Sequence, residues 1–169
     1  MSPKQMLFAF VLSRLDYCNS LLAICPKYLL SKLQKVQNNA VRFIFRTIRS
    51  AHVTPMLHSL HWLPTEQRIE NKLSLLCFKI ISHQAPVYPS ELLHLYIPSR
   101  QLRSSTDTRV FRIPSFRTKS CGQRAFSYQA PVIWNQLPVS VRHSTSVSSF
   151  KSSLKIFLFL KPFSSVSLP

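Results

Sequence analysis

The sequence predicts a mainly α-helical protein, a bundle of helices joined by short turns. Of its 169 residues, 46% are hydrophobic, which is enough to build a core and argues against a disordered polycation. Apolar residues recur at spacings of three and four over long stretches, which is the period of one face of an α-helix. Several of the 12 prolines stand where such a stretch begins, and proline favours the first position of a helix.

Residues 26–48 hold the clearest helical pattern. Pro26 suits the first helical position, because the N–H group that proline lacks would be unbonded there in any case. About 22 residues at a rise of 1.5 Å each make a rod on the order of 33 Å long. The side expected to face a core carries Leu29, Leu33, Val36, Ala40, Phe43 or Ile44, and Ile48.

The opposite side of this helix carries a row of polar residues, most of them cations, with no acid among them. The row consists of Lys32, Lys35, Asn39, Arg42 and Arg46. Two interpretations stay open for the helix taken alone. Lysine and arginine are good helix formers that are rarely buried, and most charged helix faces are only solvated, so a solvated surface is the commoner explanation of such a row. The other interpretation is a surface for a phosphate backbone, with cations spaced along a rigid rod.

The other helices before residue 98 follow from similar patterns. Residues 3–22 form a first helix, and the short connection to 26–48 favours an antiparallel hairpin of the two. A short helix is expected over 54–62, with threonine as its N-cap and proline at its first position. Residues 64–82 form a longer helix that is apolar on almost every side and is therefore expected to be nearly buried. A further short helix is expected over 89–95.

From residue 98 the sequence becomes rich in arginine, serine and threonine. We expect a basic loop with a small hairpin at 98–120, since residues 110–115 alternate as an edge strand does. Helical patterns return at 122–137, where Pro131 should kink the helix or restart it, and at 147–160. The expected organisation is a helical bundle over 1–97, the basic loop or hairpin over 98–120, C-terminal helices that pack on the bundle over 121–160, and a frayed tail over 161–169.

The net charge of +17 indicates an anionic partner. Against 22 lysines and arginines stand five acids, and self-repulsion of this size destabilises a compact chain unless a partner screens it. Residues 1–50 and 98–124 carry most of the excess, whereas 51–97 are neutral. Nucleic acid is the leading candidate and an anionic membrane surface the second. A second basic surface is expected from Arg100, Arg103, Arg109, Arg112 and Arg117.

The sequence predicts no catalytic residue, no metal site, no cofactor and no small-molecule substrate. Two-metal phosphoryl chemistry needs clustered carboxylates, whereas the five acids lie on different elements, and one glycine cannot form a phosphate-binding loop. Two histidines three residues apart, His58 and His61, lack the further ligands of a zinc site. Nothing local supports Cys77 with His83, or Cys121 with His143, as nucleophile and base. Trp62 and Trp134 are expected as core anchors rather than as platforms for bases.

The four cysteines and the lack of long apolar runs bear on the compartment. The spacing of the cysteines fits neither a disulfide framework nor a zinc motif, which favours reduced thiols. Reduced thiols are typical of an intracellular protein, and the choice between nucleus and cytoplasm is left open. No apolar run approaches the roughly 20 residues that a membrane span requires.

A series of short blocks follows one another along the chain: SRLDYCNSLL (13–22), PKY (26–28), LQKVQN (33–38), SLHWLP (59–64), YPSEL (88–92), SRQLRSS (99–105), RAFS (124–127) and APVIWNQLP (130–138). In this order the blocks resemble the C-terminal region of LINE-type, non-LTR retrotransposon reverse transcriptases of the jockey-like broad group. Each block alone has little specificity, but together they extend the resemblance over about residues 7–160.

The resemblance implies a thumb-like helical bundle with a C-terminal extension that holds the RNA template or the template–primer duplex. The palm of that family supplies paired catalytic aspartates, whereas this sequence has no Asp-Asp pair, so the chain is not expected to be an enzyme by itself. Nucleic-acid binding should be largely independent of sequence, and the palm of the parent polymerase is a second expected partner. The alternative is a relic open reading frame of a mobile element with no selected function of its own.

Overall fold

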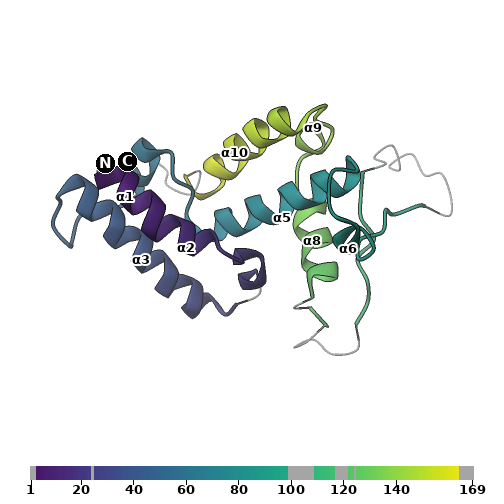
Figure 1. Ribbon diagram of the computed structural model, residues 1–169, viewed down its shortest axis with the longest axis horizontal. Helices are drawn as coiled ribbons and strands as arrows, with labels where there is room; N and C mark the ends of the chain where they lie inside the picture. The colour runs from purple at the N-terminus through teal and green to yellow at the C-terminus, as the bar shows by residue number, and fades with distance from the viewer. Residues whose placement is uncertain (1–2, 24, 99–108, 117–121, 124, 164–169) are drawn as a thin grey trace. The chain divides into compact units, whose positions relative to one another are not determined.

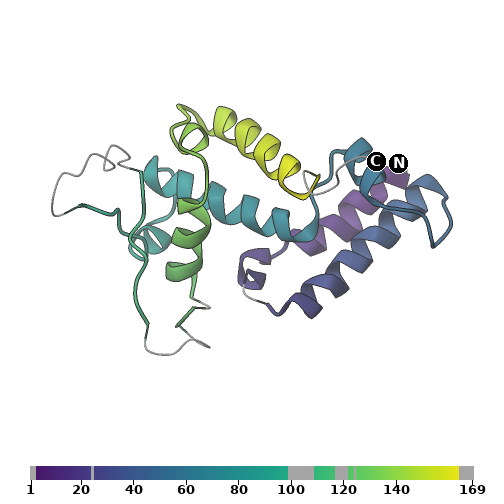
Figure 2. The same ribbon diagram turned by 180° about the vertical axis from the view of Figure 1, so that it is seen from behind.

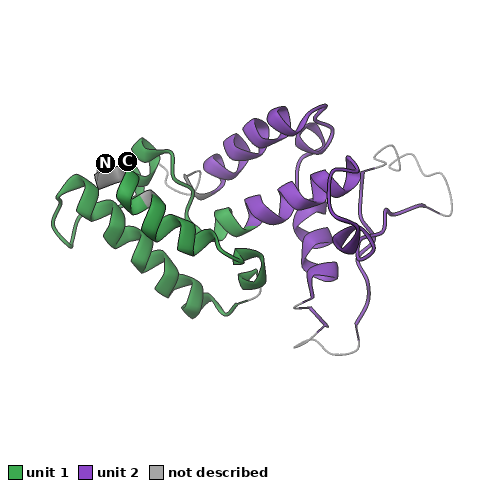
Figure 3. Cartoon of the chain, viewed as in Figure 1, with its two compact units in different colours: residues 1–69 green, residues 70–169 purple. Residues whose placement is uncertain are grey.

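The structure is a computed structural model that describes residues 3–23, 25–98, 109–116, 122–123 and 125–163. The described chain is mainly helical, as the sequence predicts, and it falls into two compact units, residues 1–69 and 70–169 (Figure 3). The boundary lies inside the long helix α5 (Thr65–Ile81), which begins in unit 1 and continues into unit 2. The sequence placed its first boundary later, at residue 97.

Unit 1 begins with a rod of three consecutive helical segments. These are α1 (Pro3–Leu7), the π-helical η1 (Phe8–Leu12) and α2 (Ser13–Asp16). The helix predicted over 3–22 therefore ends at Asp16, because Cys18 adopts a left-handed conformation with φ of 50°. A short 3-10 helix, η2 (Asn19–Leu22), follows it.

The helix α3 (Lys27–Phe45) runs antiparallel to this rod, as the sequence predicts (Figure 1). The arrangement is the same when the molecule is seen from behind (Figure 2). Leu12 and Leu15 of the rod meet Val41 of α3 in one apolar cluster, to which the short helix α4 (Thr54–Leu60) adds Leu57 and Leu60. Burial of these aliphatic side chains holds the two antiparallel segments together.

Two glutamines of α3 tie this helix to the start of α5. Gln37 is fully buried; its Nε2 donates to the carbonyl of Leu63 at 2.9 Å, and its Oε1 accepts from the hydroxyl of Thr65 at 3.3 Å. The Oε1 of Gln34 accepts the backbone N–H of Thr65 at 2.8 Å, so it satisfies one of the free donors at the N-terminus of α5. These bonds fix the position of α3 relative to the first turn of α5.

Three helices end on the same motif, with a left-handed residue other than glycine. Arg46, His61 and His83 follow α3, α4 and α5 with φ of 49°, 55° and 54°. At the end of α3, the N–H of Thr47 bonds to the carbonyl of Arg42 and that of Arg46 to the carbonyl of Phe43. This is the Schellman pattern, in which glycine is usual. The sequence predicted α3 to continue to Ile48, and it stops at Phe45 because the left-handed turn at Arg46 cannot continue a helix.

Unit 2 contains the rest of α5 and four helices of the described chain. These are α6 (Val87–Ser90), α8 (Phe126–Asn135), α9 (Val139–Arg142) and α10 (Val147–Phe163). Only Glu66 and Lys72 of α5 are exposed, which confirms the prediction that this helix is nearly buried. Pro131 is buried inside α8.

The prediction of a helix over 89–95 is wrong. The helix α6 begins at Val87 after Pro86, and it has ended by Ser90. Leu95 instead forms an antiparallel β-bridge with Phe111, through the bonds Tyr96 N–H to Val110 carbonyl and Arg112 N–H to His94 carbonyl, both 2.8 Å. This backbone pairing requires an extended conformation, so a helix cannot reach Leu95. The predicted hairpin within 98–120 lies largely outside the described residues and stays a prediction.

The core of unit 2 is built on aromatic rings. Phe78 of α5 stacks on Phe150 of α10 with ring centroids 4.3 Å apart, and Trp134 of α8 lies 5.8 Å from Phe150 and 5.9 Å from Phe111. Trp134 and Phe150 are fully buried, and Trp62 of unit 1 is 6% exposed. Both tryptophans are thus core anchors, which confirms that prediction.

Candidate nucleic-acid interface

The row of cations predicted on α3 lies on the side of the helix away from the core. Lys32 and Lys35 are exposed, whereas Gln37, Ala40 and Val41 on the opposite side are buried. The 19 residues of α3 include no acid, and at 1.5 Å per residue they span about 28 Å. The side chains of this face therefore form a cationic strip along a rigid rod.

The two arginines of the predicted row differ from the lysines. Arg42 is half-buried, and its guanidinium donates to the carbonyl of Ala51 at 3.3 Å and to the Asn39 side chain at 3.5 Å. Arg46 is exposed, but it stands just beyond the helix in the left-handed position. Lys32, Lys35 and Arg46 are therefore the members of the row whose charges face solvent most openly.

The predicted apolar face of α3 is wrong at two positions. Val36 is 48% exposed, and Ile48 lies beyond the end of the helix and is 75% exposed. Of the two choices at 43 and 44, Ile44 packs against the core cluster and Phe43 is 68% exposed. The buried Gln37 shifts the core-facing side of the helix away from Val36 and Phe43, because it needs its hydrogen-bond partners at the start of α5.

Two exposed aromatic rings share the cationic face, which the sequence analysis missed. Tyr28 is 61% exposed and Phe43 is 68% exposed. The ammonium of Lys32 lies 5.8 Å from the centroid of the Tyr28 ring, within the range of a cation–π interaction. The available signal was the spacing, since residues 28, 32, 35, 39 and 43 follow one another at intervals of three and four.

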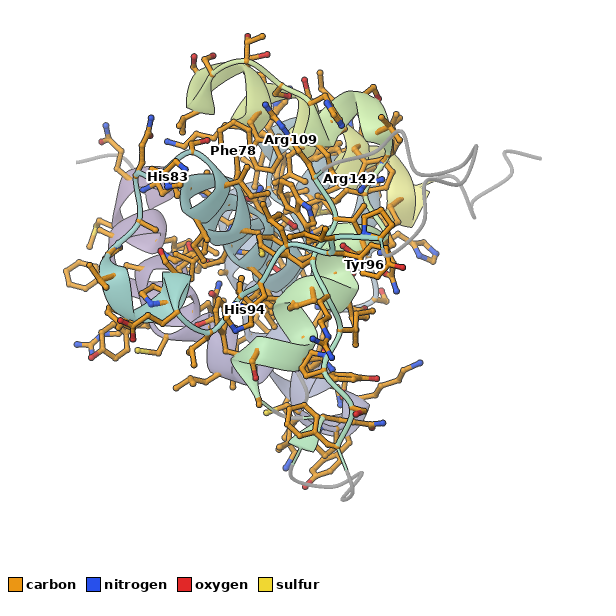
Figure 4. All side chains as sticks on the ribbon, turned by 90° about the vertical axis from the view of Figure 1, so that its right-hand side faces the viewer. Phe78, His83, His94, Tyr96, Arg109 and Arg142 are labelled. Atoms are coloured by element: carbon orange, nitrogen blue, oxygen red, sulfur yellow. The ribbon has the colours of Figure 1, made fainter. Side chains whose placement is uncertain are left out.

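The second predicted basic surface is only partly described. Arg100, Arg103 and Arg117 lie outside the described residues. Arg112 is exposed. Arg109 is half-buried, and its guanidinium donates to the carbonyls of Arg142 and Ser144 at 3.0 and 3.2 Å (Figure 4). Arg109 thus ties its extended segment to the residues around α9, which gives its charge a structural use inside unit 2.

Two of the acids lie in ion pairs away from α3. Asp16 accepts two hydrogen bonds from the guanidinium of Arg68, and the Nε of Arg68 lies 2.8 Å from its Oδ1. Glu70 accepts two hydrogen bonds from the ammonium of Lys161, both 2.9 Å long. Each of these carboxylates is matched by a cation of its own unit. Asp16 and Glu70 therefore pair with Arg68 and Lys161 and not with the lysines of α3.

The described residues offer no support for the catalytic pairs weighed from the sequence. Cys77 is fully buried and lies 3.7 Å from the carbonyl of Ala130, and burial raises the pKa of its thiol well above the ordinary value. A nucleophilic cysteine needs the opposite shift. Cys121 lies outside the described residues. His61, considered above with His58 for a zinc site, is the left-handed residue after α4. In the described part of the chain, no three histidine, cysteine or acidic side chains gather as metal ligands.

Comparisons with protein-family models, with curated proteins and with solved structures gave no match to this chain. Within the residues that the structure describes, no helix combines the length and the apolar character that a membrane crossing requires. The geometry and charge of α3, together with the blocks of sequence quoted above, are therefore the features that indicate a function.

Proposed function

We propose that this chain is a noncatalytic nucleic-acid-binding module, equivalent to the thumb and C-terminal region of a LINE-type reverse transcriptase. It binds template RNA or an RNA/DNA duplex with little dependence on sequence. The observation that carries the proposal is the exposed face of α3, where Lys32 and Lys35 stand without an acid on the same helix. The net charge of +17 adds a long-range attraction for any polyanion.

The simpler explanation of the charged α3 face is a solvated helix surface, and two features argue against it. Charged helix faces of ordinary proteins mix both signs, which limits repulsion and provides pairs at i, i+4. The α3 face has one sign only. It also exposes the rings of Tyr28 and Phe43, which gain nothing from water.

The salt dependence of binding tests the proposal. A triple variant with Lys32→Gln, Lys35→Gln and Arg46→Gln removes three charges from the α3 region. Each duplex phosphate contact contributes about 0.9 to the slope of log K against log salt, so the slope should fall by about 2.7. Fluorescence anisotropy with a labelled RNA/DNA hybrid, repeated over a range of salt concentrations, measures it.

The matched control removes the same number of charges elsewhere. Lys72, Lys151 and Lys155 are exposed lysines of α5 and α10, and their substitution by glutamine leaves the net charge equal to that of the α3 variant. We expect this control to keep most of the slope. An equal decrease of the salt slope in both variants would show that binding depends only on total charge, and it would reject α3 as the interface.

The alternative is the product of a relic reading frame without a function of its own. Large apolar side chains on the surface favour it, among them Tyr17, Leu21 and Ile97 at 78%, 77% and 87% exposure. Such surface is a liability for aggregation unless a partner, such as a polymerase palm, covers it. A soluble monomer with a cooperative thermal transition would count against this alternative, and sedimentation with calorimetry decides it.

A further inference from the structure

We propose that the α3 face binds unpaired nucleotides, with bases stacked on the rings of Tyr28 and Phe43. The preferred ligand of this site is then single-stranded RNA or DNA rather than a duplex. This inference rests on the proposed function and narrows its ligand. The observation behind it is a single row of side chains along α3 at intervals of three and four, formed by Tyr28, Lys32, Lys35, Asn39 and Phe43.

Tyr28 and Phe43 are two of several exposed rings in the described chain, and they differ from the others in lying beside the lysines of α3. The aromatic rings of unit 2 that build its core are almost completely removed from water, with Trp134 and Phe150 at 0%. Tyr28 and Phe43 remain 61% and 68% exposed, although both sit on a helix that contributes well to a core on its other side. Rings that flank a cationic strip, instead of a core, are the arrangement that proteins use to stack bases.

The lysine beside Tyr28 suits the same ligand. Lys32 is one turn further along α3, and its Nζ lies 5.8 Å from the centre of the Tyr28 ring. A base stacked on the exposed part of the ring would bring its own phosphate near this ammonium. The ring and the cation together therefore offer the two contacts that one nucleotide can make, stacking and charge neutralisation.

The spacing of the rings favours a single strand. Tyr28 and Phe43 are 15 residues apart in sequence, which is about 22 Å along the helix axis. A strand of several nucleotides would reach from one ring to the other, with its phosphates passing Lys32 and Lys35. In a duplex each internal base is already paired and stacked on its neighbours, so its faces are closed to a protein ring.

Binding to an oligouridine and to a hairpin duplex of equal length tests the inference, where the hairpin is closed by a non-nucleotide linker so that it has no unpaired bases. Tyr28→Ala and Phe43→Ala should each weaken oligouridine binding by about fivefold to tenfold, and leave hairpin binding unchanged. The slope of log K against log salt should not change, because neither variant removes a charge. Phe10→Ala and Tyr17→Ala are the controls, since these rings of unit 1 are 69% and 78% exposed and lie outside α3.

A direct measurement of stacking uses Phe43→Trp. A base stacked on this indole should quench its fluorescence on addition of oligouridine, whereas the buried Trp62 and Trp134 of the parent chain should respond little. Loss of oligouridine binding on removal of the rings, together with quenching, supports the inference. Unchanged oligouridine binding, or an equal loss for the hairpin, overturns it.

The same data separate this inference from the proposed function. If removal of the rings leaves oligouridine binding unchanged while the triple variant at Lys32, Lys35 and Arg46 still shows the smaller salt slope, the α3 interface stands and its ligand is a phosphate backbone. If that variant also binds as tightly as the parent chain, both the inference and the proposed function fail.

Discussion

Asn135 pairs with the backbone of Phe111 as a neighbouring strand would. Its Oδ1 accepts the N–H of Phe111 at 3.0 Å, and its Nδ2 donates to the carbonyl of the same residue at 2.9 Å. Beside it, the indole N–H of Trp134 donates to the carbonyl of Arg109 at 2.7 Å. The other edge of this extended segment bonds to the backbone of residues 94–96, so side chains of α8 take the place of a second strand.

Removal of the Asn135 side-chain amide should lower the free energy of unfolding of unit 2. Asn135→Ala leaves the N–H and the carbonyl of Phe111 without these partners, and two poorly satisfied backbone groups cost about 2–3 kcal/mol of stability. Urea denaturation followed by circular dichroism measures the change. Gln136→Ala, at the exposed neighbouring position, should alter stability by no more than about 0.5 kcal/mol.

Glycine at the ends of helices should stabilise the protein. His83 holds a left-handed conformation after α5 with φ of 54°, where a side chain is strained and glycine is not. His83→Gly should raise the free energy of unfolding by about 0.5–1 kcal/mol after the entropy of glycine in the unfolded chain is counted. Lys155→Gly, in the exposed interior of α10, should do the reverse and lower it by about 1 kcal/mol. Stabilisation by both changes, or by neither, would contradict this account.

The two glutamines of α3 should differ sharply in their importance. Gln37→Ala strands the carbonyl of Leu63 and the hydroxyl of Thr65 in a buried site and opens a cavity, which together cost about 3 kcal/mol. Gln34→Ala removes a bond to the N-terminus of α5 at a site that is partly open to water, and should cost about 1 kcal/mol. Thermal unfolding of the two variants compares them, and equal losses would argue against the role assigned to Gln37.

The buried thiol of Cys77 should make the protein less stable at high pH. Its folded-state pKa is raised by burial, so the folded chain keeps the proton when the unfolded chain, with a thiol pKa of about 8.5, loses it. The stability contributed by this group is thus complete below that pH and declines above it by up to about 1.4 kcal/mol per pH unit. Cys77→Ala should remove this part of the slope in urea titrations between neutral and alkaline pH.

Alkylation provides an independent check on Cys77. The exposed Cys18 should react with iodoacetamide in the folded protein, whereas Cys77 should react only after denaturation. Peptide mass spectrometry separates the two sites. Rapid labelling of Cys77 under native conditions would show that the site opens readily.

The helices and the cationic row were predictable because their signals are local. Apolar residues at intervals of three and four mark α3, α5 and α10, and a proline precedes the first residue of α3 and of α5. The ends were harder to predict, since a chain with one glycine closes α3, α4 and α5 with Arg46, His61 and His83, which carry no such signal. The exposed ring of Phe43 was missed for a related reason. Phe43 and its neighbour Ile44 are both large apolar residues, so the sequence does not show which of them enters the core.

The sequence by itself determined the helical class, the nearly buried helix α5 and the single-sign face of α3, since periodicity and charge act within one element. Only the tertiary structure decided which of two adjacent apolar residues enters the core. Gln37 needs the carbonyl of Leu63 as its partner, and this contact turns Ile44 inward and leaves Phe43 beside the lysines. This hydrogen bond joins residues 26 positions apart, and it acts together with the packing of Ile44 on the apolar cluster; no local pattern encodes either contact.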